Sequence, residues 1–345
     1  MNGRALVQGH PHPSRRAALM HPETYGLNAG TPIGVIDTTM NCVFLTPEHA
    51  YKLKTPQFDS NFDAPALAQR RRNCALEVRL NRRLATGVYQ GVSLLCARPD
   101  GALRIDTSGR PVDCLVRMQR LPHTATLEAH IATDQPPDPS AVLEPLLALY
   151  ATAPRLRQPS GYPLALQNRV RRLYHALQGV HSLVAAPDTV RLVAEFEHQV
   201  TQCGSEMVER ASAGRVVEGH GDLRPEHVYL LKHRVSIIDC LEFDRALRMV
   251  DPADEIGFLA LECSRLEADD FASGLLDSYL RASGDRPTTR LLRLYRAHRA
   301  LLWACLALRH LRTPGPTLSS AAWVVRAEGY LAAAEKALTG RWKPP

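Results

Sequence analysis

His220, Asp222 and Asp239 combine residue types and a spacing that can do chemistry on a phosphate group. His220 and Asp222 fall on a glycine-containing turn, and Asp239 follows a short apolar run seventeen residues after Asp222. Phosphoryl transfer from a nucleotide needs one carboxylate near the attacking hydroxyl and another that holds a divalent cation against the phosphates. We therefore expect Asp222 to be the catalytic base. The alternative is a turn residue that caps local N–H groups.

His220 and Asp239 have separate expected roles. The ring of His220 would hydrogen-bond the backbone and anchor the loop, although an exposed histidine without such a role fits the sequence as well. Asp239 follows Val235-Ser-Ile-Ile, which suits a buried strand. A carboxylate that leaves the end of such a strand can bind Mg²⁺ beside the phosphates. A helix or turn cap is the alternative for Asp239.

Lys52 and Lys54 are the candidate phosphate ligands. Lysine is rare, with five residues among the 42 of Lys and Arg, yet two of the five fall in one strand-like segment. Strand side chains alternate, so both ammonium groups share a face and either could contact a phosphate. Glu77, at the border of the apolar face of the next expected helix, could hold an ammonium group in place. The alternatives are lysines that block edge-strand aggregation and a solvated glutamate.

The elements that must position these residues change in character along the chain. Residues 1–30 show no periodicity and are expected to form an N-terminal arm. Residues 31–122 contain several strand-like segments and a helix near 66–85, whereas residues 123–345 are mostly helical. This pattern predicts an α+β protein with two lobes. The other helices are expected near 141–153, 164–184, 188–210, 253–282, 287–312 and 319–338, with short strands near 227–231 and 234–239.

Several of these segments resemble those of a known family. They are Val43-Phe-Leu-Thr, Ala50-Tyr-Lys-Leu-Lys, Glu77-Val-Arg-Leu and the stretch from His220 to Asp254. They are similar to the aminoglycoside phosphotransferase-like branch of the protein-kinase-like superfamily. Within it they resemble the phosphotransferase part of a bacterial family described as bifunctional aminoglycoside phosphotransferase and ATP-binding proteins. The resemblance implies a two-lobed protein-kinase-like fold, with a small strand-rich N-lobe and a larger helical C-lobe.

The resemblance also implies how the N-lobe handles a nucleotide. ATP would lie between the lobes, with its adenine against the linker at Met118, Gln119 and Leu121. Lys52, held by Glu77, would clamp the α- and β-phosphates. The glycine-rich phosphate loop of protein kinases is absent, and the segment from Thr38 to Asn41 could cover the phosphates instead.

In the C-lobe the resemblance implies that Asp239 binds the metal ion and that Asp222 receives the substrate hydroxyl. A carboxylate at the position of Asp254 would bind the backbone of the catalytic loop. Capping of a helix that begins just after Asp251-Pro252 explains Asp254 almost as well.

His227 departs from the family pattern, which usually has Asn five residues after the catalytic Asp. Imidazole suits Mg²⁺ less well than an oxygen ligand does. His227 could therefore hydrogen-bond the loop, leave only one metal ion firmly bound, or favour another divalent ion such as Mn²⁺. Glu226, Glu242 or Asp244 could supply a missing oxygen ligand.

Composition narrows the class of protein. The net charge of +7 comes from arginines scattered among acidic residues, without a basic tract, so we expect neither a nucleic-acid nor a membrane partner. No apolar run approaches the ~18 residues of a membrane-spanning helix. The eight cysteines include no CxxC pair and no zinc-like cluster with histidine, which favours buried free thiols in a cytoplasmic protein.

The phosphoryl acceptor stays open. The expected helix at 287–312 is rich in arginine and would favour an anionic or neutral acceptor if it lined the substrate cleft. Four nearby acids favour a cationic one. The basic residues are Arg290, Arg293, Arg296, Arg299, Arg309 and Arg312, with His298 and His310, and the acids are Glu262, Glu267, Asp269 and Asp270.

These patterns together favour an ATP-dependent phosphotransferase that acts on a hydroxyl of a small molecule. The alternative is a nucleotide-binding pseudokinase or regulatory module with weak or no transfer, which His227 and the missing glycine loop motivate. A third hypothesis, a helical nucleic-acid-binding protein, is supported by the net charge alone. The choice between ATP and GTP is open.

Overall fold

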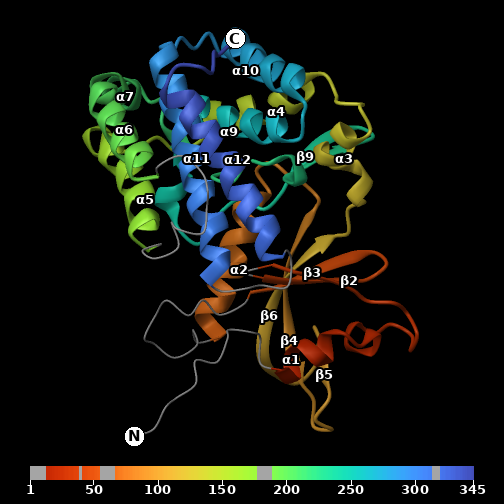
Figure 1. Cartoon of the computed structure of the whole chain (residues 1–345). Coiled ribbons are helices and arrows are strands. Elements are labelled where there is room, and N and C mark those ends of the chain that lie inside the picture. The colour runs from red at the N-terminus through yellow and green to blue at the C-terminus, as the bar shows by residue number, and fades with distance from the viewer. Residues whose placement is uncertain (1–12, 39–40, 55–66, 177–188, 313–318) are drawn as a thin grey trace, which may run out of the picture. The chain divides into compact units, whose positions relative to one another are not determined.

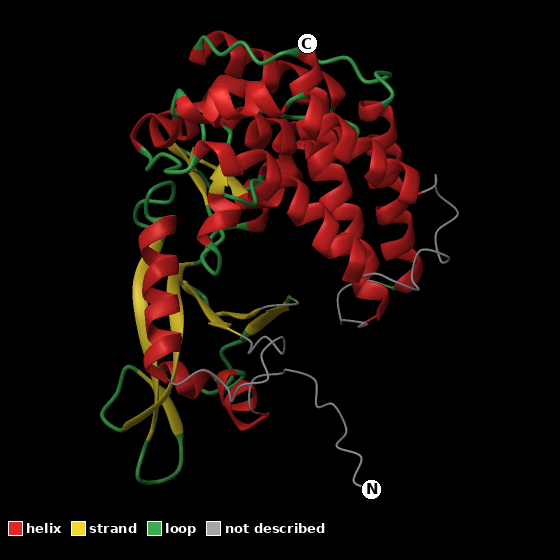
Figure 2. Cartoon of the chain, turned by 90° about the vertical axis from the view of Figure 1, so that its left-hand side faces the viewer, coloured by secondary structure: helices red, strands yellow, loops and turns green. Residues whose placement is uncertain are grey.

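The computed structural model describes residues 13–38, 41–54, 67–176, 189–312 and 319–345. The chain divides into two compact units, Met1–Pro122 and His123–Pro345. The first unit is built on an antiparallel sheet and the second is largely helical, so the predicted α+β class is confirmed (Figures 1 and 2). Part of the expected arm, the expected phosphate cover at Thr39 and Met40, and the end of the helix expected at 164–184 lie outside the described residues.

A six-stranded antiparallel sheet forms the first unit, in the order β1-β2-β3-β6-β4-β5. The segment around Lys52 becomes a central strand, β3, because it pairs with β2 on one side and β6 on the other. The strands are β1 (Gly34–Asp37), β2 (Asn41–Leu45), β3 (His49–Lys54), β4 (Tyr89–Ala97), β5 (Leu103–Ile105) and β6 (Arg110–Gln119).

Apolar side chains cover both faces of this sheet. Phe44, Leu53, Leu95 and Leu115 form a buried cluster on one face. The helix α2 (Leu67–Asn81) packs against β4 and β6 (Figure 2). It buries one stripe of its surface. Because Glu77 belongs to that buried stripe, its carboxylate is enclosed instead of solvated.

Part of the expected N-terminal arm is ordered. Residues expected to be part of an arm form the helix α1 (Pro13–Leu19) and a 3₁₀ turn, η1 (Pro22–Tyr25), and Leu19 belongs to the buried cluster. Arg15 pairs with Asp113 at 2.7 Å. Two turns of helix are too short to show a periodicity, so tertiary contacts account for their order.

Ten helices lie among the described residues of the second unit. They are α3 (Leu127–Ala132), α4 (Pro139–Thr152), α5 (Tyr162–Ala176), α6 (Thr189–Gln202), α7 (Gly204–Ser212), α8 (Arg245–Arg248), α9 (Pro252–Arg265), α10 (Asp269–Ser283), α11 (Thr289–Arg312) and α12 (Ser320–Leu338). The strands are paired as β7 (Val217–Glu218) with β10 (Met249–Val250) and β8 (Val228–Leu231) with β9 (Arg234–Ile237).

Two helices predicted as continuous are each broken in two. The pattern at 188–210 becomes α6 and α7, which meet at Cys203-Gly204. The pattern at 253–282 becomes α9 and α10, and between them Glu267 adopts a positive φ of 64°. The apolar periodicity continues through both breaks because each pair of helices covers the same core, so periodicity alone does not reveal them.

The helix α9 is the centre of the second unit. It packs against α10 and α11 and is buried along most of its length (Figure 1). Its N-cap is Asp251, whose carboxylate accepts a hydrogen bond from the amide of Ala253 at 3.0 Å. This rigid helix therefore presents its first turn, Pro252 to Glu255, to the loop that carries Asp222.

All eight cysteines are free and buried, as expected for small core residues. Among the described residues, no helix combines the length and apolarity needed to cross a membrane.

Candidate active site

Both candidate lysines contact the same carboxylate. The Nζ atom of Lys52 lies 2.9 Å from Oε1 of Glu77, and Nζ of Lys54 lies 2.5 Å from Oε2. The contact predicted between Lys52 and Glu77 is therefore present, and Lys54 shares it. The Glu77 side chain is fully buried, so water screens its attraction to the two ammonium groups less than in a surface salt bridge, and these contacts orient the ammonium groups.

The other nucleotide-binding candidates of the first unit lie near the end of β6. Met118 is buried and pairs with Ala50 in β3, whereas Gln119 is exposed and Leu121 is half-buried. Contact of these residues with adenine remains a prediction. At the β1–β2 turn, the hydroxyl of Thr38 accepts a hydrogen bond from the amide of Asn41 at 3.0 Å.

His220 connects the loop that carries Asp222 to the segment that precedes Asp239. The amide of Asp222 donates to Nδ1 of His220 at 3.3 Å, so the proton of the neutral ring is on Nε2, which donates to the carbonyl of Ile238 at 2.8 Å. Burial lowers the pKa of His220, which favours this neutral form. The structure thus shows the backbone anchor that the sequence predicts for His220.

Glu255 is the carboxylate that binds the backbone of the loop, and the sequence prediction missed it. Its Oε1 accepts hydrogen bonds from the amides of His220 at 3.0 Å and Gly221 at 2.6 Å. Its Oε2 accepts one from the hydroxyl of Tyr150 at 2.7 Å. The signal that could have found Glu255 was its place in the first turn of α9, next to Asp254.

Asp254 acts on the loop through an arginine, so the predicted direct contact is wrong. Its carboxylate forms a bidentate pair with Arg299, with an Nη2–Oδ2 distance of 2.6 Å, and Nη1 of Arg299 donates to the carbonyl of Gly221 at 3.2 Å. The alternative, that Asp254 is the helix cap, is also wrong because Asp251 holds that position. Despite burial, the Arg299 guanidinium holds the pKa of Asp254 well below its usual range.

Glycine is required where the loop passes Glu255. A Cβ atom on Gly219 would lie 2.5 Å from Oε2 of Glu255 and 2.7 Å from Cγ2 of Val250. We expect Gly219→Ala to lower the free energy of unfolding by about 1–3 kcal/mol, since overpacking forces these groups to move.

A Cβ on Gly257, in α9, would meet no atom within 4 Å. The matched Gly257→Ala should therefore stabilise by about 0.5–1 kcal/mol. Urea unfolding compares the two variants, and a Gly219→Ala protein as stable as the parent would contradict the prediction.

His227 lies between the two candidate carboxylates. Its Nδ1 donates to the backbone carbonyl of Asp222 at 2.9 Å and lies 4.0 Å from Oδ2 of the same residue. Its Nε2 lies 3.8 Å from Oδ2 of Asp239. The structure therefore brings together Asp222, His227 and Asp239, as their spacing predicts.

Asp239 has an unusual backbone conformation, with a φ of 65°, and its side chain is 41% exposed. A non-glycine residue in this region is strained, and such strain persists where the surroundings fix it. Here two hydrogen bonds hold the preceding residue, Ile238. The carbonyl of Ile238 accepts from His220, and the amide of Ile238 donates to the carbonyl of His227 at 3.0 Å.

The donor atoms of Asp239 and His227 fit a divalent cation. Their separation of 3.8 Å is too long for a hydrogen bond. It is short enough for a carboxylate oxygen and an imidazole nitrogen to bind one cation at about 2.0–2.2 Å each. Because Nδ1 donates to a backbone carbonyl, Nε2 carries the lone pair of the neutral ring, which is the usual arrangement of a metal-bound histidine. The imidazole nitrogen makes this mixed donor set less suited to Mg²⁺, which prefers oxygen ligands.

Other residues proposed from the sequence serve the fold. Asp244 caps α8 through the amide of Ala246 at 2.8 Å. On α11, Arg290 donates to Gln202 and Arg293 donates to the carbonyl of Trp342. These two arginines therefore have local partners of their own.

His298, next to the Arg299–Asp254 pair, predicts a pH dependence of stability. It is fully buried, with Nδ1 3.3 Å from Oδ1 of Asp254. Burial lowers the pKa of His298 below its ordinary value of 6.5, although Asp254 acts in the opposite direction. The unfolded chain therefore binds a proton that the folded protein does not, so stability is complete above pH ~6.5 and falls as the pH drops below it.

The measurement is urea unfolding at several pH values between about 5 and 8. In His298→Gln the free energy of unfolding should fall less steeply as the pH drops below the ordinary histidine pKa. Some pH dependence should remain, because burial also lowers the pKa of His220. A variant with the same slope as the parent would contradict this origin of the pH dependence.

Comparisons with known proteins support the fold. A scan against protein-family models gives no match. Uncharacterized proteins of Mycobacterium bovis and Mycobacterium tuberculosis are 29% identical over 280 residues, which covers 79% of this chain and 54% of theirs. The chain thus spans about half the length of the curated relatives it matches.

Two solved structures carry the structural comparison. A choline/ethanolamine kinase family protein from Mesorhizobium loti has a TM-score of 0.54 and 15% identity, and the alignment covers 94% of this chain and 98% of that one. The GDP and kanamycin complex of APH(2")-IIia has a TM-score of 0.52 and 15% identity, with 95% and 99% covered. The chain has the α+β protein-kinase-like fold of these structures, as predicted.

Proposed function

We propose that the protein is an ATP-dependent phosphotransferase that moves the γ-phosphoryl group to a hydroxyl of a small molecule. The observation that carries the proposal is the proximity of Asp222, His227 and Asp239. Glu255 and Arg299 hold the backbone of the loop that carries Asp222, and His220 ties that loop to the segment that carries Asp239. Such positioning is the main protein contribution to phosphoryl transfer. We also infer a relationship to the phosphotransferase part of the bifunctional family named above.

Asp222 would act on the acceptor. Its side chain is 19% exposed, and no described residue donates a hydrogen bond to its carboxylate, so both oxygens remain available to a substrate hydroxyl. His220 would hold the loop and make no contact with the reacting groups. His227 would fix the backbone of Asp222 through its Nδ1 proton.

Lys52 and Lys54 would bind phosphate oxygens, with Glu77 holding both ammonium groups. Asp239 and His227 would hold a divalent cation, Mg²⁺ or Mn²⁺. When bound, such a cation neutralises phosphate charge. Gln119 and Leu121 would contact the base of the nucleotide, beside the buried Met118.

Thermal denaturation with ATP and either Mg²⁺ or Mn²⁺ tests the nucleotide part of the proposal. A ligand at 100 times its Kd stabilises the folded protein by about 2.7 kcal/mol. We expect this stabilisation to be lost in both Lys52→Ala and Asp239→Ala. The exposed Lys336→Ala, on α12, is a control that should keep it. Stabilisation that survives in both site variants would contradict the proposal.

A nucleotide-binding module without transfer activity is the second candidate. The observation that favours it is His227, an imidazole where the family usually has an amide. ADP formation across a panel of hydroxyl compounds separates the two candidates. Nucleotide binding without ADP formation under any condition, with Mg²⁺ or Mn²⁺, would favour the binding module.

A further inference from the structure

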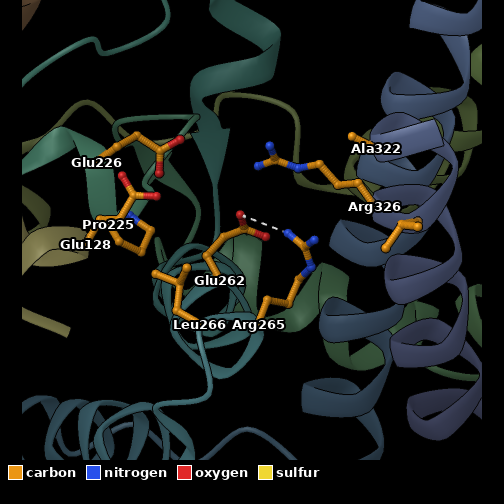
Figure 3. Close-up of a pocket in the computed structure, with 9 residues that line it drawn as sticks. Glu128, Pro225, Glu226, Glu262, Arg265, Leu266, Ala322 and Arg326 are labelled. Carbon is orange, nitrogen blue, oxygen red and sulfur yellow. Dashed lines mark ion pairs between the residues drawn. The ribbon is translucent and has the colours of Figure 1, made fainter. Parts of the chain in front are cut away.

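A pocket of about 280 Å³ lies in the second unit, next to the catalytic loop (Figure 3). It is lined by residues from α3, the loop after Asp222, the end of α9 and α12. They are Glu128, Pro225, Glu226, Glu262, Arg265, Leu266, Ala322, Val325 and Arg326. The volume lies just below the ~300–1,000 Å³ of drug-sized ligand pockets. The space therefore suits a small acceptor.

The pocket is close to Asp222 through Arg224. Pro225 and Glu226, which line it, follow Asp222 by three and four residues. The guanidinium of Arg224 contacts the carboxylate of Glu226 and lies 3.8 Å from Oε2 of Glu262. Burial acts to lower the pKa of Arg224, but the charge of Asp222 and then that of Glu226 raise it.

Two of the three carboxylates in the pocket are already neutralised. Glu226 is paired with Arg224. Glu262 accepts a hydrogen bond from the hydroxyl of Tyr330 at 2.8 Å and lies 3.6 Å from Nη1 of Arg265. The guanidinium of Arg265 in turn stacks 3.8 Å from the centre of the Tyr330 ring. These groups form a closed set in which each charge has a counter-charge.

Glu128 and Arg326 form none of these contacts, although the charge of Arg326 also acts to lower the pKa of Glu226 and its guanidinium lies 5.8 Å from the centre of the Trp323 ring. Neither has an ion-pair partner among the described residues, and Nε of Arg326 is buried without a hydrogen bond. In Figure 3, Glu128 and Glu226 reach into the pocket from one side, and the Arg326 side chain reaches over it from the other. The pocket therefore presents one negative and one positive group that a ligand could pair.

We propose that this pocket binds the phosphoryl acceptor and that the acceptor is a small zwitterion, with its ammonium group at Glu128 and its carboxylate or phosphate at Arg326. This inference rests on the proposed function. A polycation would meet Arg265 and Arg326, and a polyanion would meet the carboxylates, so each leaves one like-charge contact in a partly buried site. A zwitterion pairs both groups.

Binding of two matched sets of hydroxyl compounds tests the inference. One set is homoserine (zwitterion), 4-hydroxybutyrate (anion), 3-amino-1-propanol (cation) and 1-propanol (neutral). The larger set is 2-amino-2-deoxygluconate, gluconate, glucamine and sorbitol, in the same order of charge. Kd is measured by calorimetry with a non-hydrolysable ATP analogue and Mg²⁺ or Mn²⁺ present. In at least one set the zwitterion should bind about tenfold more tightly than either singly charged member. A tenfold change in Kd is what one charge-assisted hydrogen bond typically contributes.

Charge-removing variants assign the two ends of the ligand. Glu128→Gln should weaken the zwitterion and the cation by about tenfold and leave the anion unchanged. Arg326→Gln should weaken the zwitterion and the anion, and Arg326→Lys should restore part of that loss. Glu144→Gln and Lys336→Gln, both exposed and outside the pocket, are matched controls that should bind like the parent.

The outcomes separate failure of this inference from failure of the proposed function. Zwitterions that bind no better than the cations in either set, or an Arg326→Gln variant that binds all compounds like the parent, would overturn the zwitterion pocket. In that case ADP formation from another acceptor would leave the phosphotransferase intact. Conversely, the predicted binding pattern with no ADP formation from any compound would support the pocket and count against the transfer activity.

Discussion

Asp222→Asn should reduce phosphoryl transfer by about 10²–10⁴-fold, the typical contribution of a positioned acid or base. The amide has almost the shape of the carboxylate but cannot accept the hydroxyl proton. Its backbone contacts, to His220 and to His227, are main-chain bonds that the substitution keeps. Nucleotide binding and thermal stability should therefore stay close to those of the parent, so that the loss appears in kcat.

The measurement is the rate of ADP formation with an accepted hydroxyl compound, together with the Kd of the nucleotide. Asp270→Asn, an exposed aspartate at the start of α10, is the matched control and should react like the parent. A variant at Asp222 that retains the parental rate would show that this carboxylate is a turn residue without a part in the reaction.

Arg299→Ala should lower the free energy of unfolding by about 3–5 kcal/mol, because it leaves the Asp254 carboxylate buried with only His298 as a partner. Both side chains are almost completely buried, with 3% of Arg299 and none of Asp254 exposed. The same change removes the hydrogen bond to the carbonyl of Gly221, so ADP formation should fall as well. Arg299→Lys keeps the charge but not the bidentate geometry, and an intermediate loss is expected.

Arg281→Ala is the matched control for the effect of burial. Arg281 also pairs with an aspartate, Asp277, but on the surface of α10, where the arginine is 68% exposed. Exposed pairs of this kind contribute about 0–1 kcal/mol. Urea unfolding compares the three variants. If Arg299→Ala cost no more than Arg281→Ala, the buried pair would not be the support of the loop that the structure indicates; should Arg299→Ala not fold, the loss in Arg299→Lys decides.

The fold class followed from local patterns. The strand-like segments within residues 31–122 predicted the sheet, and the change to helical periodicity after Pro122 predicted the second unit. These signals come from neighbours within about two turns or a few strand residues. They say little about where a helix breaks, which is why the joins at Cys203 and Glu267 were not predicted.

The sequence predicted the loop that carries Asp222 better than it predicted the residue that binds the backbone of that loop. Asp254 was selected as its backbone ligand, and Glu255, one residue further on, is the residue that binds it. Neighbouring positions on a helix point about 100° apart, so the choice between them depends on the rotation of α9 about its axis. Packing against α10 and α11 sets that rotation.

Three features of this protein could be inferred from the sequence alone, because each depends on residues close together in the chain. They are the turn with His220 and Asp222, the strand that leads to Asp239, and the two lysines of β3. Turn preferences and the alternation of strand side chains depend on a few consecutive residues, so both can be read from the amino-acid sequence alone. The pairing of Asp254 with Arg299, the capture of the loop by Glu255 and the opposed charges of Glu128 and Arg326 required the folded chain. Each joins helices or loops that are far apart in sequence, and only the burial of apolar faces against one another sets which side chains meet there.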